Sequence, residues 1–238
     1  MRRKIIRLGH LTGLIVAVKI LVVLGLFALF AVYTNVPTDD HDKSVAVFEN
    51  ILHLEPLRYP KNFNEEIIAI RTLQSRTFAI APVGEGIPDY EAREPSDFIG
   101  KREGLCYDRS RTNDKALRYF GFASRHVYLL YREKGRGFWS SLVHYGHPSH
   151  AVTEVKTSKG WMFVDSNTNW IALTRDGQVV NADDVWKRAA EFDSIPSYLT
   201  HPWWAIRGMY SRKGQLYPPY ILFPDFNWYD LLTWLLFG

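Results

Sequence analysis

The stretch that decides the fold is SHAVTEVKTSKGWMFVD, residues 149–165. These residues include two runs, Ala151–Lys156 and Trp161–Asp165, and a third run, Arg125–Tyr131, precedes them. All three are rich in β-branched and aromatic residues, which is typical of strands. If Lys156 faces Lys159 across a two-residue turn, the hairpin register places His150 directly opposite Asp165. Their β-carbons would then lie about 4.5–5.5 Å apart, close enough for the carboxylate to hold the imidazole in one tautomer. A purely structural polar pair at the end of a sheet is the alternative interpretation.

Cys106 is the only cysteine of the 238 residues. It excludes an internal disulfide framework and any multi-cysteine metal site. Cys106 begins a predicted helix that ends near Phe120, before Gly121. At a helix start, unpaired N–H groups and the helix dipole favour a thiolate and can bind a developing oxyanion. A lone cysteine is also often an inert apolar residue. However, a histidine with a carboxylate partner is the general base that a thiol nucleophile needs.

Four sequence blocks occur in a characteristic order: GLCYD (104–108), GFASRHV (121–127), SHAVTEV (149–155) and GWMFVD (160–165). Together they resemble the transglutaminase-like superfamily of cysteine enzymes, over roughly residues 98–169. The resemblance implies an α+β, papain-like core in which a helix bearing Cys106 packs on an antiparallel sheet. It also implies a triad of Cys106 as nucleophile, His150 as general base and acid, and Asp165 as the orienting carboxylate. The sequence departs from the family pattern at Val152, usually aromatic, and at Ser166, usually proline.

By the same resemblance, we expect a cysteine hydrolase, protease or acyltransferase that acts on an amide or peptide bond, with no cofactor. The alternative is a non-catalytic scaffold in an envelope or polysaccharide-related assembly. Arg125 matches a family position that is usually structural. A second oxyanion donor is not identified by the sequence, and the candidates are Gln74, Tyr107 and Trp161.

We expect no metal site. His144, His147 and His150 have a spacing that mimics a metal triad on a helix, but Gly146 and Pro148 argue against a helix there. The acidic pair at residues 183–184 is too small a cluster for calcium.

Basic residues are concentrated at the N-terminus. The chain has 29 Lys and Arg against 25 Asp and Glu, and five of the basic residues are Arg2, Arg3, Lys4, Arg7 and Lys19. The remainder is close to neutral, so we expect no nucleic-acid partner.

The apolar run Leu11–Tyr33 is long enough to span a bilayer of about 30 Å. The basic cluster predicts a cytoplasmic N-terminus, with the rest of the chain in the periplasm or otherwise outside a bacterial inner membrane. A cleaved signal peptide is the alternative.

These observations divide the chain into a basic tip and transmembrane anchor (1–36), a transglutaminase-like domain (37–197) and an aromatic-rich tail (198–238). Within the domain, helical spacing also predicts a helix over Asn181–Glu191. The tail holds 12 of the 35 aromatic residues. Its last apolar segment, Trp228–Phe237, is too short to span a membrane. It is expected to lie at the membrane interface, to contact a partner protein, or to help close the domain core.

Overall fold

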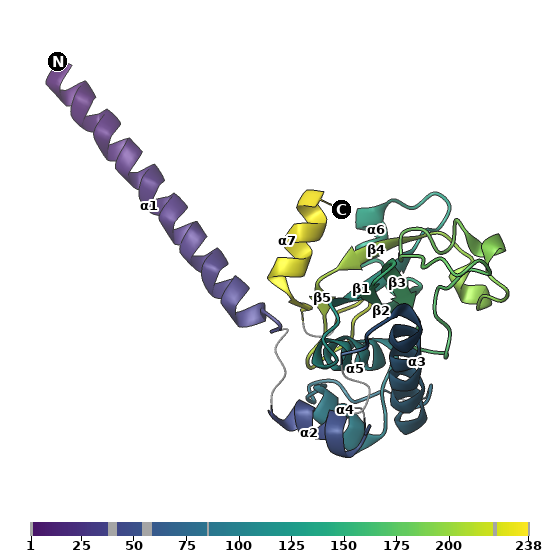
Figure 1. Ribbon diagram of the computed structural model, residues 1–238. Coiled ribbons are helices and arrows are strands. Elements are labelled where there is room, and N and C mark those ends of the chain that lie inside the picture. Colours follow the sequence, from purple (N-terminus) through teal and green to yellow (C-terminus); the bar gives the residue numbers. More distant parts are fainter. Residues whose placement is uncertain (1, 38–41, 54–58, 85, 221–222, 238) are drawn as a thin grey trace. The chain divides into compact units, whose positions relative to one another are not determined.

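The computed structural model describes residues 2–37, 42–53, 59–84, 86–220 and 223–237, and the chain divides into two units, 1–35 and 36–238 (Figure 1). The first unit is one helix, α1 (Arg2–Thr34). Its segment Gly13–Thr34 has a mean hydropathy of 2.9 and is the one helix in the described ranges that is long and apolar enough to cross a membrane. The predicted span lies within α1. An N-terminal signal sequence passes the same test of length and composition.

The second unit is built on a four-stranded antiparallel sheet with the order β3-β2-β1-β4. The strands are β1 (Ser124–Tyr131), β2 (Ser149–Thr157), β3 (Gly160–Val164) and β4 (Trp203–Arg207). A two-stranded ribbon, β5 (Met209–Tyr210) with β6 (Asp225–Phe226), follows. The first three strands confirm the sequence prediction, whereas β4 was not predicted. Because β4 pairs with β1 and buries Trp203, part of the aromatic-rich tail completes the sheet.

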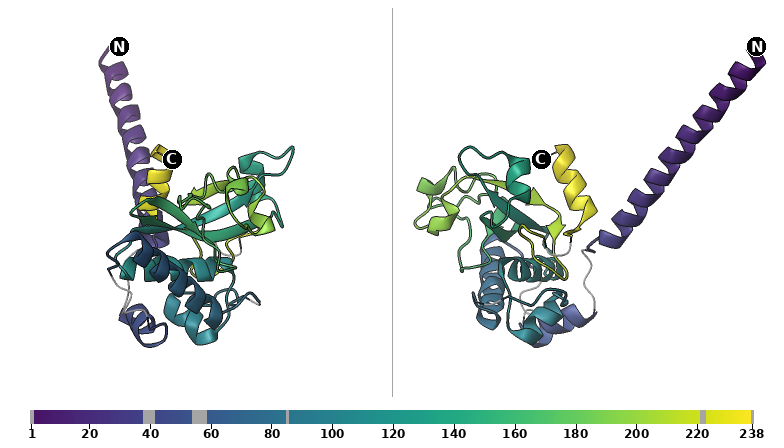
Figure 2. Two further views of the ribbon diagram at one scale, coloured as in Figure 1. Left: turned by 45° about the vertical axis from the view of Figure 1, so that its right-hand side comes forward. Right: turned by 180° about the vertical axis from the view of Figure 1, so that it is seen from behind.

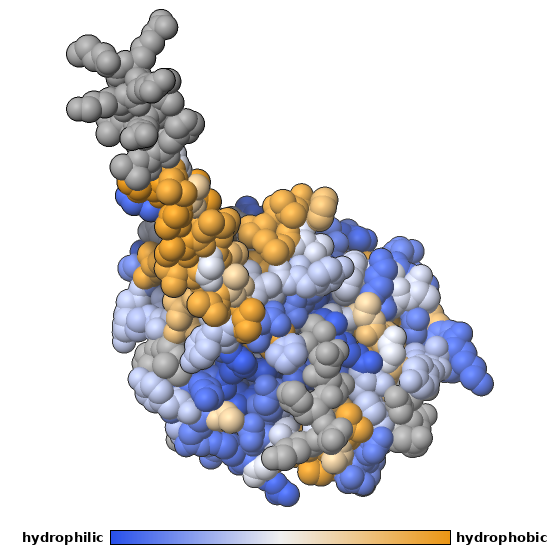
Figure 3. Space-filling view, turned by 90° about the vertical axis from the view of Figure 1, so that its left-hand side faces the viewer, coloured by the Kyte–Doolittle hydropathy of each residue, from blue (hydrophilic) through white to orange (hydrophobic). Residues whose placement is uncertain are grey.

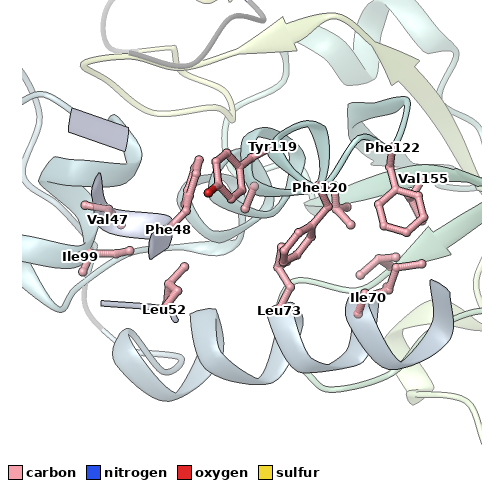
Figure 4. Packing of buried hydrophobic residues seen from close by; sticks show 14 of the residues in the cluster. Val47, Phe48, Leu52, Ile70, Leu73, Ile99, Tyr119, Phe120, Phe122 and Val155 are labelled. Carbon is pink, nitrogen blue, oxygen red and sulfur yellow. The ribbon is translucent and has the colours of Figure 1, made fainter. Parts of the chain in front are cut away.

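Helices cover one face of this sheet (Figures 1 and 2). They are α2 (Asp42–Asn50), α3 (Phe63–Ile80), α4 (Pro95–Lys101) and α5 (Cys106–Tyr119). Figure 4 shows their core, in which Phe48 lies beside Tyr119, Leu73 lies beside Phe120, and Val155 of β2 lies beside Phe122. Two further helices, α6 (Phe138–Val143) and α7 (Trp228–Phe237), lie outside this layer. The mixed α+β fold, with a helix bearing Cys106 on an antiparallel sheet, is confirmed.

The opposite face of the sheet is covered by residues 170–199, which pack on Val152, Phe163 and Trp203. The predicted helix Asn181–Glu191 is wrong, because this segment forms turns and a short 3₁₀ helix at Ala189–Glu191. Tertiary contacts explain the difference. The Ala182 N–H donates to Glu154 Oε1 (2.7 Å), and the Ala182 carbonyl accepts from the Trp203 indole (2.7 Å). Both backbone groups of Ala182 are therefore held by residues of β2 and β4, and these tertiary contacts override the local helical pattern.

The β2–β3 register differs from the predicted one by two residues. Thr157 pairs with Gly160, so the turn is Ser158–Lys159. Gly160 has φ +128° and the Thr157 hydroxyl donates to its carbonyl, which together fix the turn there. The shift places Asp165 diagonally across from His150 rather than directly opposite. Because two residues are one full period of a strand, both residues keep the predicted face.

Candidate active site

The start of α5 is fixed by a buried carboxylate. Asp108, in the first turn, accepts the N–H of Leu105 (2.9 Å) and pairs with the Arg93 guanidinium at 3.1 Å. Gly104 lies so close to Phe98 that a β-carbon there would fall 2.3 Å from the ring. Cys106 is therefore the first residue of a helix whose entry angle is tightly constrained, and its side chain is half-buried. Sequence reasoning missed Arg93, the partner of Asp108. The spacing from Leu105 to Asp108, which is that of a capping box, is the signal that could have drawn attention to Asp108.

His150 and Asp165 form a buried pair. The imidazole Nε2 lies 2.7 Å from Asp165 Oδ1, and the two residues are 5% and 0% exposed. The second carboxylate oxygen of Asp165 accepts hydrogen bonds from the Tyr198 hydroxyl (2.6 Å) and the Thr168 hydroxyl (2.7 Å). The Tyr198 ring also packs edge-on against the imidazole, with centroids 5.4 Å apart. Tyr198 and Thr168 thus hold the Asp165 carboxylate in place. Sequence reasoning missed both residues, because no periodic signal in the sequence indicates them.

Electrostatics in this group favour a protonated imidazole. Burial alone would lower the pKa of His150. Hydrogen bonds to Asp165 and to the Cys106 side chain, together with the charges of these two groups, outweigh it and raise the pKa to about 10. Burial would raise the pKa of Asp165, but the His150, Tyr198 and Thr168 contacts hold it below its ordinary value. The structure therefore brings Cys106, His150 and Asp165 into one interacting set. Whether they act as a catalytic triad stays a prediction.

Because Nε2 is engaged by Asp165, Nδ1 is the imidazole nitrogen left for the Cys106 thiol. In a catalytic triad, which stays a prediction, Asp165 would orient the ring and Nδ1 would exchange a proton with sulfur.

Two buried side chains support the loop that carries Asp165. The Gln74 amide donates to the carbonyls of Asp165 (2.7 Å) and Trp170 (2.8 Å). The Arg109 guanidinium donates to the carbonyls of Ser166 (2.6 Å) and Gly104 (2.7 Å), so it links the Asp165 loop to the segment before Cys106. Burial lowers the pKa of Arg109, while the charges of Cys106, Asp108 and Asp165 favour its protonated form.

The three candidate oxyanion donors differ in their partners and in whether they lie near Cys106. Gln74 is committed to backbone carbonyls. Trp161 lies near the hairpin turn, where its ring stacks under the Arg125 guanidinium at 4.1 Å. Only Tyr107 of the three lines a cavity that also contains Cys106.

Two neighbouring cavities meet at His150. The smaller, about 250 Å³, is lined by Cys106, Tyr107, Arg109 and His150, among others. The larger, about 690 Å³, lies on the side of Tyr131, Tyr198 and His201. Both share Ser149, His150 and Asn167. Cys106 and His150 therefore border a cavity, whereas Asp165 is fully buried and lines neither of the two.

The remaining residues singled out by sequence have structural contacts. Arg125 pairs with the fully buried Glu154 (2.7 Å), which also binds Arg207. His147 Nε2 lies 2.7 Å from the Tyr131 carbonyl. In the part of the chain that the structure describes, no group of three or more His, Cys, Asp or Glu side chains is arranged to hold a metal ion.

Comparison with known proteins matches part of this chain to a family. Residues 66–166 match the family model described as the transglutaminase-like superfamily, and this range includes Gln74, Cys106, His150 and Asp165. Comparison with curated proteins and with solved structures gave no match. Residues 66–166 belong to the transglutaminase-like superfamily, and the chain therefore carries a transglutaminase-like domain.

Proposed function

We propose that the protein is a cysteine enzyme that cleaves or transfers an amide or peptide acyl group through a thioester on Cys106. The observation that carries this proposal is the position of His150, whose Nε2 lies 2.7 Å from Asp165 Oδ1 and which lines one cavity together with Cys106. A general base held by a carboxylate beside a thiol is the arrangement that nucleophilic catalysis requires. Transglutaminase-like domains are often cysteine enzymes, which agrees with this assignment.

The reaction would begin with attack of Cys106 Sγ on the substrate carbonyl carbon. The oxyanion would accept a hydrogen bond from the backbone N–H at the start of α5. Collapse of the tetrahedral intermediate would break the C–N bond as the His150 imidazolium gives its Nδ1 proton to the leaving amine. Water or a second amine would then attack the thioester, its proton passing to Nδ1, and the C–S bond would break to restore the thiolate.

We further propose that α1 spans a bacterial inner membrane, with the N-terminus in the cytoplasm and the domain outside. The apolar length of Gly13–Thr34 supports the span, and the basic residues before Leu8 support the orientation. The enzyme would then act on protein, peptide or other amide-containing substrates at the outer side of that membrane.

The test is acylation of Cys106 by an activated ester, followed by mass spectrometry of the peptide that contains it. Since the chain has one cysteine, the adduct has a single possible site on sulfur. We expect His150→Ala to slow acylation by about 10²-fold or more, the range of general-base catalysis. His144→Ala, the same substitution at an exposed histidine, is the matched control.

Circular dichroism of each variant checks that the fold is intact. Equal rates in His150→Ala and His144→Ala would overturn the proposal and favour the non-catalytic scaffold. So would a wild-type rate no higher than that of the urea-unfolded chain.

A further inference from the structure

Helix α7 exposes an apolar face that the described part of the domain leaves uncovered. Trp234, on its inner side, packs in the cluster beside Trp204 of β4. The outward residues are Tyr229 (78% exposed), Leu232 (49%), Leu235 (60%), Leu236 (70%) and Phe237 (84%). Figure 3 colours apolar surface orange, and these exposed residues of α7 are apolar.

The helix begins at a rigid point. The Asn227 N–H donates to the Gly208 carbonyl (2.9 Å), and its own carbonyl accepts the Leu231 N–H (3.0 Å). Gly208 has φ +75°, and a β-carbon there would lie 2.5 Å from the Leu231 nitrogen. The apolar face is therefore held in a fixed direction on the domain, which distinguishes it from a loosely attached tail.

The chain that leaves α1 enters the domain at this same point. The Val36 N–H donates to the Phe226 carbonyl (2.8 Å), and the Asn227 side-chain amide donates to the Val36 carbonyl (3.0 Å). Val36 is 1% exposed. Thr34, the last residue of the apolar segment of α1, is two positions earlier, so at most about 7 Å of chain separates it from Val36. Covalent connectivity imposes this limit for every orientation of α1.

If α1 spans a bilayer, the first residue of α7 must therefore lie close to the surface of that bilayer. An interfacial helix buries its apolar face about 5–10 Å into the headgroup and acyl boundary. This depth is comparable to the maximum distance of about 7 Å between Thr34 and Val36. With ten residues, α7 is about 15 Å long, too short to span.

Helix α6 adds apolar side chains beside the same strand. Phe138 packs on Trp204 with ring centroids 5.5 Å apart, and Trp204 and Trp234 line one small cavity. The neighbouring Trp139 is 76% exposed. Tryptophan is enriched where proteins meet the membrane–water interface.

We propose that the exposed face of α7 lies in the interfacial layer of the bilayer that α1 spans, so that the domain is held against the membrane at two points. The proposal rests on α1 being a membrane span and is independent of catalysis by Cys106. Its consequence is a fixed orientation of the domain, and hence of its two cavities, relative to the membrane surface.

The test uses the full chain in lipid nanodiscs of phosphatidylcholine and phosphatidylglycerol, with a single chain in each disc. In a Cys106→Ala background, one nitroxide label is attached through Leu235→Cys on α7. Ile68→Cys on α3 is the matched control, and Leu24→Cys reports on the span. The three native side chains are 60%, 57% and 58% exposed. Collision with oxygen and with a water-soluble nickel chelate then measures the surroundings of each label.

We expect the label at Leu235 to lose nickel accessibility and keep oxygen accessibility, as the label at Leu24 does, while the label at Ile68 remains open to nickel. The proposal is overturned if Leu235 behaves like Ile68 while Leu24 is in the bilayer. It is also overturned if the Leu235 label is shielded from both reagents, which would indicate a protein contact. A water-accessible label at Leu24 would remove the span and the proposal with it. A second label at Leu236→Cys guards against a local effect of one substitution.

Discussion

Replacing Asp165 by asparagine tests the electrostatic reasoning most directly, because it keeps the shape of the side chain and removes its charge. The pKa of His150 rises from 6.5 to about 10, and this difference corresponds to about 5 kcal/mol in favour of the imidazolium. The side chain is 5% exposed, so solvent screening reduces this figure little. Because burial by itself lowers this pKa, the contributions of Asp165 and Cys106 together exceed the net rise. If the two contribute equally, the substitution removes at least about 2–3 kcal/mol and lowers the pKa of His150 to about 8 or below.

The assay compares alkylation of Cys106 by iodoacetate and by iodoacetamide across the alkaline range. The anionic reagent is attracted by a positive imidazolium beside the thiolate, whereas the neutral one is not. In the wild type, the preference for iodoacetate should therefore persist until the imidazolium loses its proton near pH 10. In Asp165→Asn, the preference should disappear at least about two pH units lower. Asp176→Asn, a change at an exposed carboxylate, is the control.

The reasoning would be refuted by identical pH dependence in wild type and Asp165→Asn when circular dichroism shows both folded. That result would mean that the carboxylate does not hold the proton on His150, and that its role is limited to packing and hydrogen bonding.

Three further predictions follow from individual contacts. Tyr198→Phe removes one hydrogen bond to Asp165 and should slow Cys106 acylation by about fivefold to tenfold, the equivalent of about 1 kcal/mol, while the melting temperature stays within a few degrees. Burial lowers the pKa of His126 from 6.5 to about 4. As the pH falls, the unfolded chain therefore binds a proton at this histidine before the folded chain does. About 3 kcal/mol of stability should be lost between pH 6.5 and pH 4. Urea unfolding at both pH values measures this loss, and it should be smaller in His126→Phe. Glu154→Gln leaves Arg207 buried without its full countercharge and should lower the free energy of unfolding by about 3 kcal/mol in the same urea assay.

Local patterns in the sequence predict most of the helices and strands of the fold. The strands β1, β2 and β3 were predicted because each is a short run of β-branched and aromatic residues between turn-forming residues. The helix α5 was predicted because Gly121 marks its end, and Gly121 has φ +92° in the structure. In contrast, β4 lies in a segment whose many aromatic residues are equally typical of an interfacial tail. Its place in the sheet depends on pairing with β1, which no local pattern indicates.

The helix predicted at Asn181–Glu191 failed for a related reason. Its apolar spacing satisfied the helical period, but the Ala182 N–H and carbonyl are both taken by distant residues, Glu154 and Trp203. The side chains that hold Asp165 in place were missed for the same reason, because their contacts are tertiary. Tyr198 and Gln74 reach Asp165 across 33 and 91 positions of sequence. Such contacts are decided by tertiary packing, and single residues carry no periodic signal of them.

The predicted contact between His150 and Asp165 is present although the predicted hairpin register is wrong, and the reason is geometric. The register of the β2–β3 hairpin was wrong by two residues, so His150 and Asp165 are not directly opposed. A shift of one residue would have sent Asp165 to the other face of the sheet, whereas a shift of two preserves the face and adds only a diagonal offset. Diagonal neighbours stand about 7–8 Å apart at the backbone, still within reach of long side chains. The imidazole closes that gap, which is why the Nε2–Oδ1 distance is 2.7 Å despite the altered register. The parity of the two positions, rather than the exact turn, is therefore the sequence feature that brings this pair together.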